Sequence, residues 1–340
     1  MLVDAVLARL TGRESALPEW PLATVQQVGL ATGLTALAGS LGLFDTADSD
    51  VVAYVQEQQG QVQARADRFA ALTPKVLGAL AAADLCAVPV KGAVLGGSAG
   101  GQAVWRSPGT RPMSDIDVLV PARYRAQAGA ALARAGWSLY ATEDHEDTFL
   151  AWGDGSVGRT DGESADHNGR VEVHPGWLEF LHGYTARGFD IEVEAHRTDD
   201  GQWRFAEPAF AVHVVGHLAS TVVRAEVRAV NLLDVYFLHQ RGLDWTAIGQ
   251  VMRSVDPRLT GPGLWLVDRV LPHVVPSELL RSELGRLRHA ELLAATPTAA
   301  VLRDPTQRTT SRWRSAFAQS PAEQASVARQ LGRSAVGRFR

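Results

Sequence analysis

The chain is poor in cysteine and in long apolar runs. Cys86 is the single cysteine among 340 residues, so the chain forms no internal disulfide, which fits a reducing compartment. The longest apolar stretches, such as 29–43, are interrupted by glycine, threonine and serine and are shorter than the ~20 residues that span a bilayer. No basic leader followed by an apolar core opens the sequence. We therefore expect a soluble, cytoplasmic protein without a membrane partner.

Lysine is also scarce, because only Lys75 and Lys91 are lysines among 33 basic residues. Lysine is a compact point charge, whereas arginine is a planar fork, so a lysine in an arginine-rich background marks a position that needs a point charge. Arginines gather in 296–340, which holds eight of them against Asp304 and Glu323. This tail is interpreted as a solvated helix. The remaining chain is acidic, so a nucleic-acid partner is not expected.

The overall composition is that of a globular protein, with 46% hydrophobic and 21% charged residues. No repeat of solenoid length is visible. Hydrophobic periodicity and turn residues divide the chain into a helical region at 1–84, an α/β core at 85–204 and a helical region at 205–340. We therefore expect an α+β protein in which helices flank a mixed sheet.

The expected helices have the 3.6-residue periodicity of amphipathic segments. Pro74 should bend or divide the longest of them. These helices span 2–10, 23–41, 48–83, 121–135, 208–221, 224–239 and 245–255, and further helical segments follow to the end of the chain.

The expected strands are short apolar or alternating runs bounded by turn residues. A loop rich in proline and glycine fills 105–114, and a polar linker at 153–168 ends in a hairpin-like turn at 166–169. The strands span 86–90, 115–120, 138–142, 148–152, 170–174 and 189–194.

The strongest chemical signal is the pair Asp115 and Asp117. Side chains two residues apart on a strand leave the same face, so both carboxylates should project together while Ile116 and Val118 enter the core. Adjacent carboxylates repel each other unless a cation lies between them, and hard oxygen ligands suit Mg²⁺. The alternative is a strand with one solvated acidic face.

Two turns ahead of this pair are candidates for binding phosphate. Lys91-Gly92 and Gly97-Ser98 both lie where a strand should turn into a helix, and glycine there lets backbone N–H groups approach an anion. A tight turn with close helix packing explains the same glycines. Arg111, at the end of the following loop, either stabilises phosphate charge or braces the loop with a salt bridge.

Together these features resemble the bacterial nucleotidyltransferase family within the DNA polymerase beta superfamily. The resemblance spans roughly 50–240 and rests on a strand ending in Lys91-Gly92, the segment Arg111-Pro-Met-Ser-Asp115-Ile-Asp117, and a later Val-Glu172-Val-His174. The spacing departs from the family pattern, because Ser98 stands 17 residues before Asp115 and Gly92 stands 23 before it. Lys91-Gly92 is the preferred equivalent of the family's phosphate turn, and Gly97-Ser98 stays open.

The resemblance implies a third acid on a neighbouring strand. Glu172 is the preferred residue, as a metal ligand or as the acceptor of the nucleophile's proton. The alternating acids of 190–194 are the rival, and a solvated edge strand is their simpler explanation. His174 contacts the nucleotide or donates a structural hydrogen bond that orients the site.

The resemblance also implies a nucleotidyltransferase-like fold and a reaction. A nucleoside monophosphate would pass from an NTP, expected to be ATP, to an acceptor hydroxyl, amine or carboxylate, and pyrophosphate would leave. Two Mg²⁺ ions would be held by Asp115, Asp117 and Glu172. The acceptor is an unidentified small molecule, peptide or protein. The alternatives are a non-catalytic nucleotide- or partner-binding relative, such as one component of a two-protein module, and phosphoryl transfer at the same site.

Overall fold

The structure is a computed structural model that describes residues 2–13, 19–99, 103–105, 107–151, 169–181, 184–224, 227–288 and 290–295. It confirms the predicted α+β fold, a mixed sheet with flanking helices. The predicted linker at 153–168 and the arginine-rich tail at 296–340 lie outside the described residues. The chain forms two compact units, each described by itself. Unit 1 is Met1–Pro175 with Arg197–Arg204, and unit 2 is Gly176–His196 with Phe205–Arg340. The predicted three-domain division stays a prediction.

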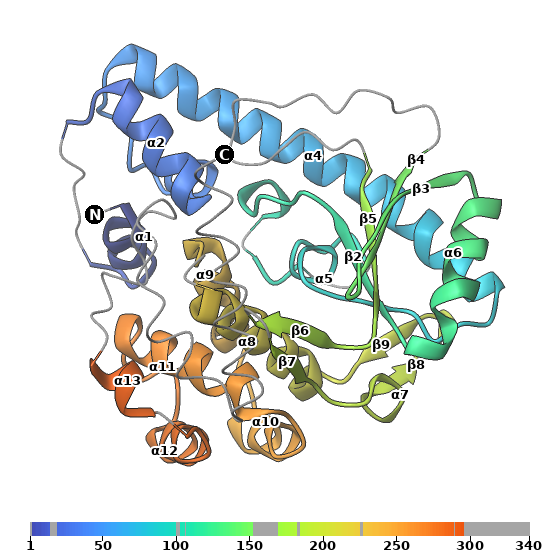
Figure 1. Cartoon of the computed structure of the whole chain (residues 1–340). Helices are drawn as coiled ribbons and strands as arrows, with labels where there is room; N and C mark the ends of the chain where they lie inside the picture. Colours follow the sequence, from blue (N-terminus) through green and yellow to red (C-terminus); the bar gives the residue numbers. More distant parts are fainter. Residues whose placement is uncertain are drawn as a thin grey trace, which may run out of the picture. The chain divides into compact units, whose positions relative to one another are not determined.

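A five-stranded sheet is the centre of unit 1, with the order β1-β2-β5-β4-β3 (Figure 1). β2 and β5 run parallel, and the other neighbouring pairs are antiparallel. In this order β5 is the middle strand and β2 is its neighbour, so the acids that they carry lie away from the sheet's edges. The strands are β1 (Val88–Pro89), β2 (Ile116–Val120), β3 (Trp137–Thr142), β4 (Asp147–Ala151) and β5 (Val171–Pro175).

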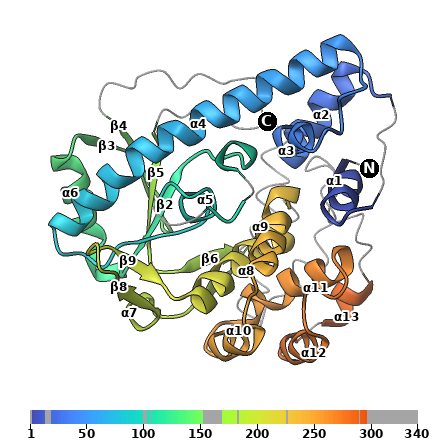
Figure 2. The ribbon, with the colours of Figure 1, turned by 180° about the vertical axis from the view of Figure 1, so that it is seen from behind.

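One face of this sheet is covered by two helices. α4 (Ser49–Ala82) and α6 (Arg125–Arg134) pack on it, and α4 crosses the sheet in Figure 2. Ile116, Val118 and Val120 are fully buried in the core that these helices share with β5. Because side chains alternate along a strand, the residues between them must leave by the opposite face.

The helical front of unit 1 differs from its prediction in two places. The single helix expected over 23–41 is two helices, α2 (Leu22–Thr32) and α3 (Thr35–Ser40), because Gly33 ends α2 in the left-handed conformation, with φ +69°. Pro74 was expected to bend or divide the helix, and the division is wrong, since α4 runs unbroken through that residue. Pro74 is exposed, so the hydrogen bond it lacks is lost on the solvent side of the helix.

The remaining elements of unit 1 are short, apart from the first helix. The helices are α1 (Leu2–Leu10), α5 (Gly92–Leu95) and the 3₁₀ turns η1 (Pro108–Thr110) and η2 (Ala122–Tyr124). α6 follows η2 directly, which splits the helix predicted over 121–135 into a 3₁₀ turn and an α-helix.

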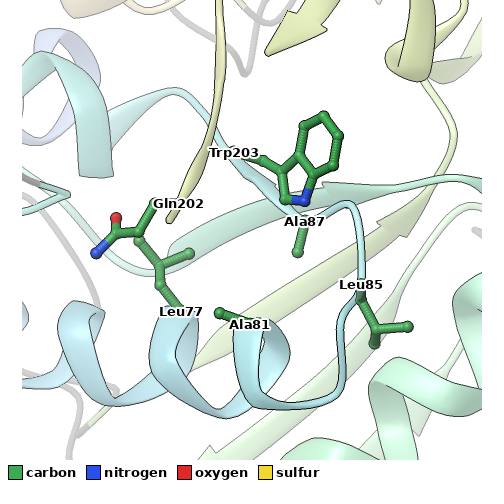
Figure 3. Close-up of a pocket in the computed structure, with 6 residues that line it drawn as sticks. All are labelled: Leu77, Ala81, Leu85, Ala87, Gln202 and Trp203. Carbon is green, nitrogen blue, oxygen red and sulfur yellow. The ribbon is translucent and has the colours of Figure 1, made fainter. Parts of the chain in front are cut away.

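A hollow in unit 1 lies between α4 and β9 (Trp203–Phe205). Figure 3 shows Trp203 facing Leu77 and Ala81 of α4 across it, with Gln202 on one side. Leu85 and Ala87 complete its lining. None of these side chains is ionisable, so the hollow is distinct from the acidic cluster described below.

Unit 2 is mainly helical. Trp177 is its central packing residue, because a β-carbon added at Gly188 or Gly216 would lie 1.9 or 2.1 Å from the indole. Trp177 also makes edge-to-face contacts with Phe189 and His213. The predicted helices at 208–221, 224–239 and 245–255 correspond to α8 (Glu207–Arg224), α9 (Ala229–Gln240) and α10 (Trp245–Met252). The helices of unit 2 are α7 (Ile191–Glu194), α8 (Glu207–Arg224), α9 (Ala229–Gln240), α10 (Trp245–Met252), η3 (Pro257–Leu259), α11 (Gly261–Val270), α12 (Ser277–Gly285) and α13 (Ala290–Ala295).

The strand predicted over 189–194 is wrong. Asp190 caps a single helical turn instead, since its Oδ1 accepts a hydrogen bond of 3.0 Å from the backbone N–H of Glu192. The local cap outweighs the alternating pattern of the sequence. The strand follows as β8 (Ala195–Arg197), which pairs with β9, and the hairpin β6 (Leu178–Leu181) with β7 (Tyr184–Arg187) was not predicted.

Among the described helices, none is both long enough and apolar enough to cross a bilayer.

Candidate functional site

Two carboxylates lie side by side on the sheet of unit 1. Asp117 on β2 and Glu172 on β5 are register partners in the parallel pair, so both leave the same face. That face is opposite to the core occupied by Ile116, Val118 and Val173. Both acids are nevertheless buried, with exposed fractions of 2% and 6%. Two buried acids this close need nearby positive charge.

Asp117 has two cationic or hydrogen-bonding neighbours. Its Oδ1 lies 2.7 Å from Nζ of Lys91 and 3.0 Å from Nε2 of His174. Burial alone would raise the pKa of Asp117, but Lys91 and His174 outweigh it and hold that pKa well below its usual value. Burial would likewise lower the pKa of Lys91, and the charges of Asp117, Glu172 and Asp115 raise it instead. The buried Asp117 and the partly buried Lys91 therefore form an ion pair.

Glu172 is held differently. Its carboxylate pairs with the guanidinium of Arg170, two residues earlier in the chain. Burial, followed by the negative charges of Asp115 and Asp117, raises the pKa of Glu172 to about 9. At neutral pH this carboxyl group favours its protonated form, and any added cation would favour the ionised form.

Asp115 stands one residue before β2 and is partly buried. Its Oδ2 accepts a hydrogen bond of 2.8 Å from the Ser114 hydroxyl. Burial and the charge of Asp117 raise its pKa to about 6. Asp115 lies outside β2, so its projection with Asp117 from one strand face stays a prediction. Asp115 is outside the tightest group of ligand atoms, which joins Asp117, Glu172 and His174 within 4.8 Å of one another.

Two residues of the cluster were missed from the sequence, Arg170 and Glu146. Arg170 reaches Glu146 at 3.6 Å as well as Glu172. Glu146 Oε2 also faces Nδ1 of His174 at 3.9 Å. Glu146 precedes β4, and β4 pairs with β5 through Asp147 opposite Val173. Only that register brings Glu146 to the site, so no local signal in the sequence marks it.

Lys91 and Gly92 form the turn into α5. Lys91 has φ +47° and ψ −124°, a conformation that glycine adopts far more readily than other residues. Gly92 packs against Arg111, because a β-carbon there would lie 2.9 Å from Arg111 Nη1 and 3.1 Å from Met113 Cγ. The structure therefore brings three predicted residues together: Lys91 at the acids, and Gly92 with Arg111 beside them.

Gly97 and Ser98 are placed differently. The Ser98 hydroxyl donates to the carbonyl of Ala93 at 3.1 Å and lies 3.2 Å from Thr73 Oγ1 on α4. Gly97 has φ +81°, and a β-carbon there would lie 3.0 Å from Ala103. Within the described contacts, this turn serves packing against α4 and shows no link to the acids.

The cluster fits a divalent cation by its donor set. Asp117, Glu172 and His174 offer two carboxylate oxygens and one imidazole nitrogen on the same face of the sheet. A cation would offset the mutual repulsion of the acids, which the raised pKa of Glu172 reports.

Comparison with known proteins gives one match. No curated protein and no solved structure matches the chain. A family model described as an uncharacterised nucleotidyltransferase matches residues 15–270, which is well over half of the sequence and includes Lys91, Asp117 and Glu172. The chain therefore belongs to this uncharacterised nucleotidyltransferase family.

Proposed function

We propose that the chain is a metal-dependent nucleotidyltransferase that moves a nucleoside monophosphate from an NTP to an acceptor hydroxyl, amine or carboxylate and releases pyrophosphate. One observation supports this most strongly. Asp117 and Glu172 share one face of adjacent parallel strands, and the Lys91 ammonium lies beside them. This arrangement offers oxygen ligands for a cation and a point charge for a phosphate.

Each residue has a proposed role. Asp115, Asp117 and Glu172 hold the divalent cation, with Mg²⁺ as the expected ion and two ions as the expected number. A bound cation would neutralise part of the triphosphate charge. With a cation held by Asp117, the Lys91 ammonium would be available to a phosphate oxygen. Glu172, when ionised, is also positioned to accept the proton of an acceptor group.

The turn at Lys91-Gly92 and the loop that ends at Arg111 supply the remaining contacts. Gly92 keeps the backbone open next to Arg111, whose guanidinium would stabilise the negative charge that develops on the phosphates. Gly97 and Ser98 hold that turn against α4. The broader resemblance to the DNA polymerase beta superfamily supports the same division of roles.

The direct test follows label from NTP to product. The full-length protein is incubated with a cell extract, Mg²⁺ or Mn²⁺, and each of the four NTPs labelled at the α-phosphate. Transfer of α-label to an acceptor is expected, and it should be lost in Asp117→Asn. Asp199→Asn is the matched control, because Asp199 is exposed on a turn. Label that moves only from the γ-position would identify phosphoryl transfer instead.

A second candidate is a non-catalytic relative that binds a nucleotide or a partner protein. The contacts of the acids favour it, because Lys91 already neutralises Asp117, and Arg170 already contacts Glu172. Such a protein would be stabilised against heat by an NTP with a divalent cation and would transfer no label. Stabilisation together with transfer would reject this candidate.

A further inference from the structure

The face of His174 that points away from Asp117 carries a second carboxylate. Nε2 of the ring lies 3.0 Å from Asp117 Oδ1 and 3.8 Å from Glu172 Oε2, so it converges with both acids. Nδ1, on the other side of the ring, faces Glu146 Oε2 at 3.9 Å. One nitrogen of the imidazole is therefore directed at Asp117 and Glu172, and the other is directed at Glu146.

This arrangement has the chemistry of a metal-binding histidine. A histidine that ligates a metal with one nitrogen usually presents the other ring N–H to a carboxylate, which fixes the tautomer and the orientation of the ring. Without a cation, the Nε2 proton is the one that serves Asp117. If the proton moves to Nδ1, where Glu146 faces it, Nε2 has a lone pair that can bind a metal ion.

Arg170 keeps Glu146 in this position. Its guanidinium lies 3.6 Å from Glu146 Oε1 and also pairs with Glu172. Oε1 of Glu146 therefore faces Arg170, while Oε2 faces His174 Nδ1 at 3.9 Å and His145 Nε2 at 3.5 Å.

From this geometry we infer that His174 is itself a metal ligand, that Glu146 is the residue that positions it, and that the site prefers a first-row transition-metal cation to Mg²⁺. Mg²⁺ is bound almost entirely by oxygen, whereas an imidazole nitrogen favours the transition metals. The inference rests on the proposed nucleotidyltransferase site and changes the expected metal centre. It replaces a magnesium ion held by oxygen alone with a transition metal held by oxygen and nitrogen.

Nitrogen coordination can be measured on the full-length protein without any assay of activity. Mn²⁺ is added as a paramagnetic probe, and electron spin-echo envelope modulation detects nitrogen bound directly to it. The wild type is expected to show the ¹⁴N modulation of one imidazole, which changes to a ¹⁵N pattern when histidine is labelled. The modulation should vanish in His174→Gln and persist in His196→Gln, whose ring is exposed.

Metal affinities test the role of Glu146 and the preference for a transition-metal cation. Mn²⁺ binding should weaken about 10–100-fold in Glu146→Gln, the loss typical of an outer-shell partner, and stay unchanged in Glu143→Gln. His174→Gln should reduce the affinity for Mn²⁺ more than the affinity for Mg²⁺. Mn²⁺ that binds without ¹⁴N modulation would overturn the inference and leave the proposed function standing. A wild type that binds no divalent cation at all would overturn both.

Discussion

At the scale of single residues, the site is a balance of buried charges. The pKa values of Asp117 and Glu172 move in opposite directions. Lys91 and His174 favour the ionised form of Asp117 and lower its pKa. Burial and the neighbouring acids disfavour the ionised form of Glu172 and raise its pKa. The sequence identified these four residues, since spacing on a strand and the family resemblance both point to them. Glu146 escaped because strand register, rather than spacing along the chain, brings it in. Arg170 lies two residues before Glu172, so the spacing rule for strands would have found it.

The first prediction concerns the only two lysines of the chain. Lys91→Met should lower the free energy of unfolding by about 3 kcal/mol, because it leaves the buried carboxylate of Asp117 without its cation. Lys75→Met should stay within about 0.5 kcal/mol of the wild type, since Lys75 is exposed. Urea unfolding without divalent cations measures both values. Equal losses in the two variants would contradict a structural role for the Lys91 pair.

The second prediction concerns pH. The pKa of Glu172 rises from 4.5 to about 9 on folding, so its contribution to stability is complete below pH 4.5 and is lost as the pH rises toward 9. Asp115, raised to about 6, acts in the same direction at lower pH. Between pH 5 and 8 the metal-free wild type should therefore lose at least ~1 kcal/mol relative to Glu172→Gln.

Chemical denaturation of both proteins at each pH, with a chelator present, measures this difference. Added Mn²⁺ should remove it at high pH, since a cation binds the ionised carboxylates. Parallel stability curves for the two proteins would show that Glu172 titrates normally.

At the scale of secondary-structure elements, the sequence predicted the elements better than their boundaries. Alternation of apolar residues gave β2 and β5 correctly, because both strands have one face in the core. Alternation failed over 189–194, where the Asp190 cap makes a helical turn. Gly33 divides a predicted helix, and Pro74 does not, because a left-handed residue ends a helix whereas an exposed proline removes only one hydrogen bond.

The third prediction concerns the turn between β1 and α5. Gly92→Ala should weaken NTP binding at least about tenfold and cost about 1–2 kcal/mol of stability, because its β-carbon would crowd Arg111 and Met113. Gly78→Ala is the matched control. A β-carbon at Gly78 meets nothing within 4 Å, so this helix position should gain about 0.5–1 kcal/mol.

NTP titration by calorimetry, together with thermal unfolding, separates the two effects of Gly92→Ala. Unchanged NTP affinity in a folded Gly92→Ala protein would remove this turn from the binding site.

At the scale of the whole molecule, the chain organises two compact units that sequence periodicity did not separate. The helical front and the sheet belong to unit 1, which also receives Arg197–Arg204 from much later in the chain. The boundary falls between Pro175 and Gly176, a dipeptide typical of turns, but a turn alone does not indicate a division into units. Long-range contacts determine the grouping, and they are invisible to local patterns.

The fourth prediction tests the cohesion of unit 2. Gly216→Ala should destabilise unit 2 by about 3 kcal/mol, because its β-carbon would lie 2.1 Å from Trp177 and 3.2 Å from the carbonyl of Leu259. Hydrogen exchange should accelerate in α8 and leave the amides of β2 protected. Gly285→Ala, where a β-carbon meets nothing within 4 Å, should change neither. Loss of protection in both elements together would mean that the units unfold as one.

The backbone of Lys91 has a consequence for how the site opens. A residue with a β-carbon at φ +47° and ψ −124° stores about 1–3 kcal/mol of conformational energy, which is released if the turn relaxes. The same residue makes the ion pair with Asp117. If a bound cation displaced the ammonium and the turn relaxed, the released energy would offset part of the cost of breaking the pair. Separating Lys91 from Asp117 would then cost less free energy than the 2.7 Å contact alone indicates.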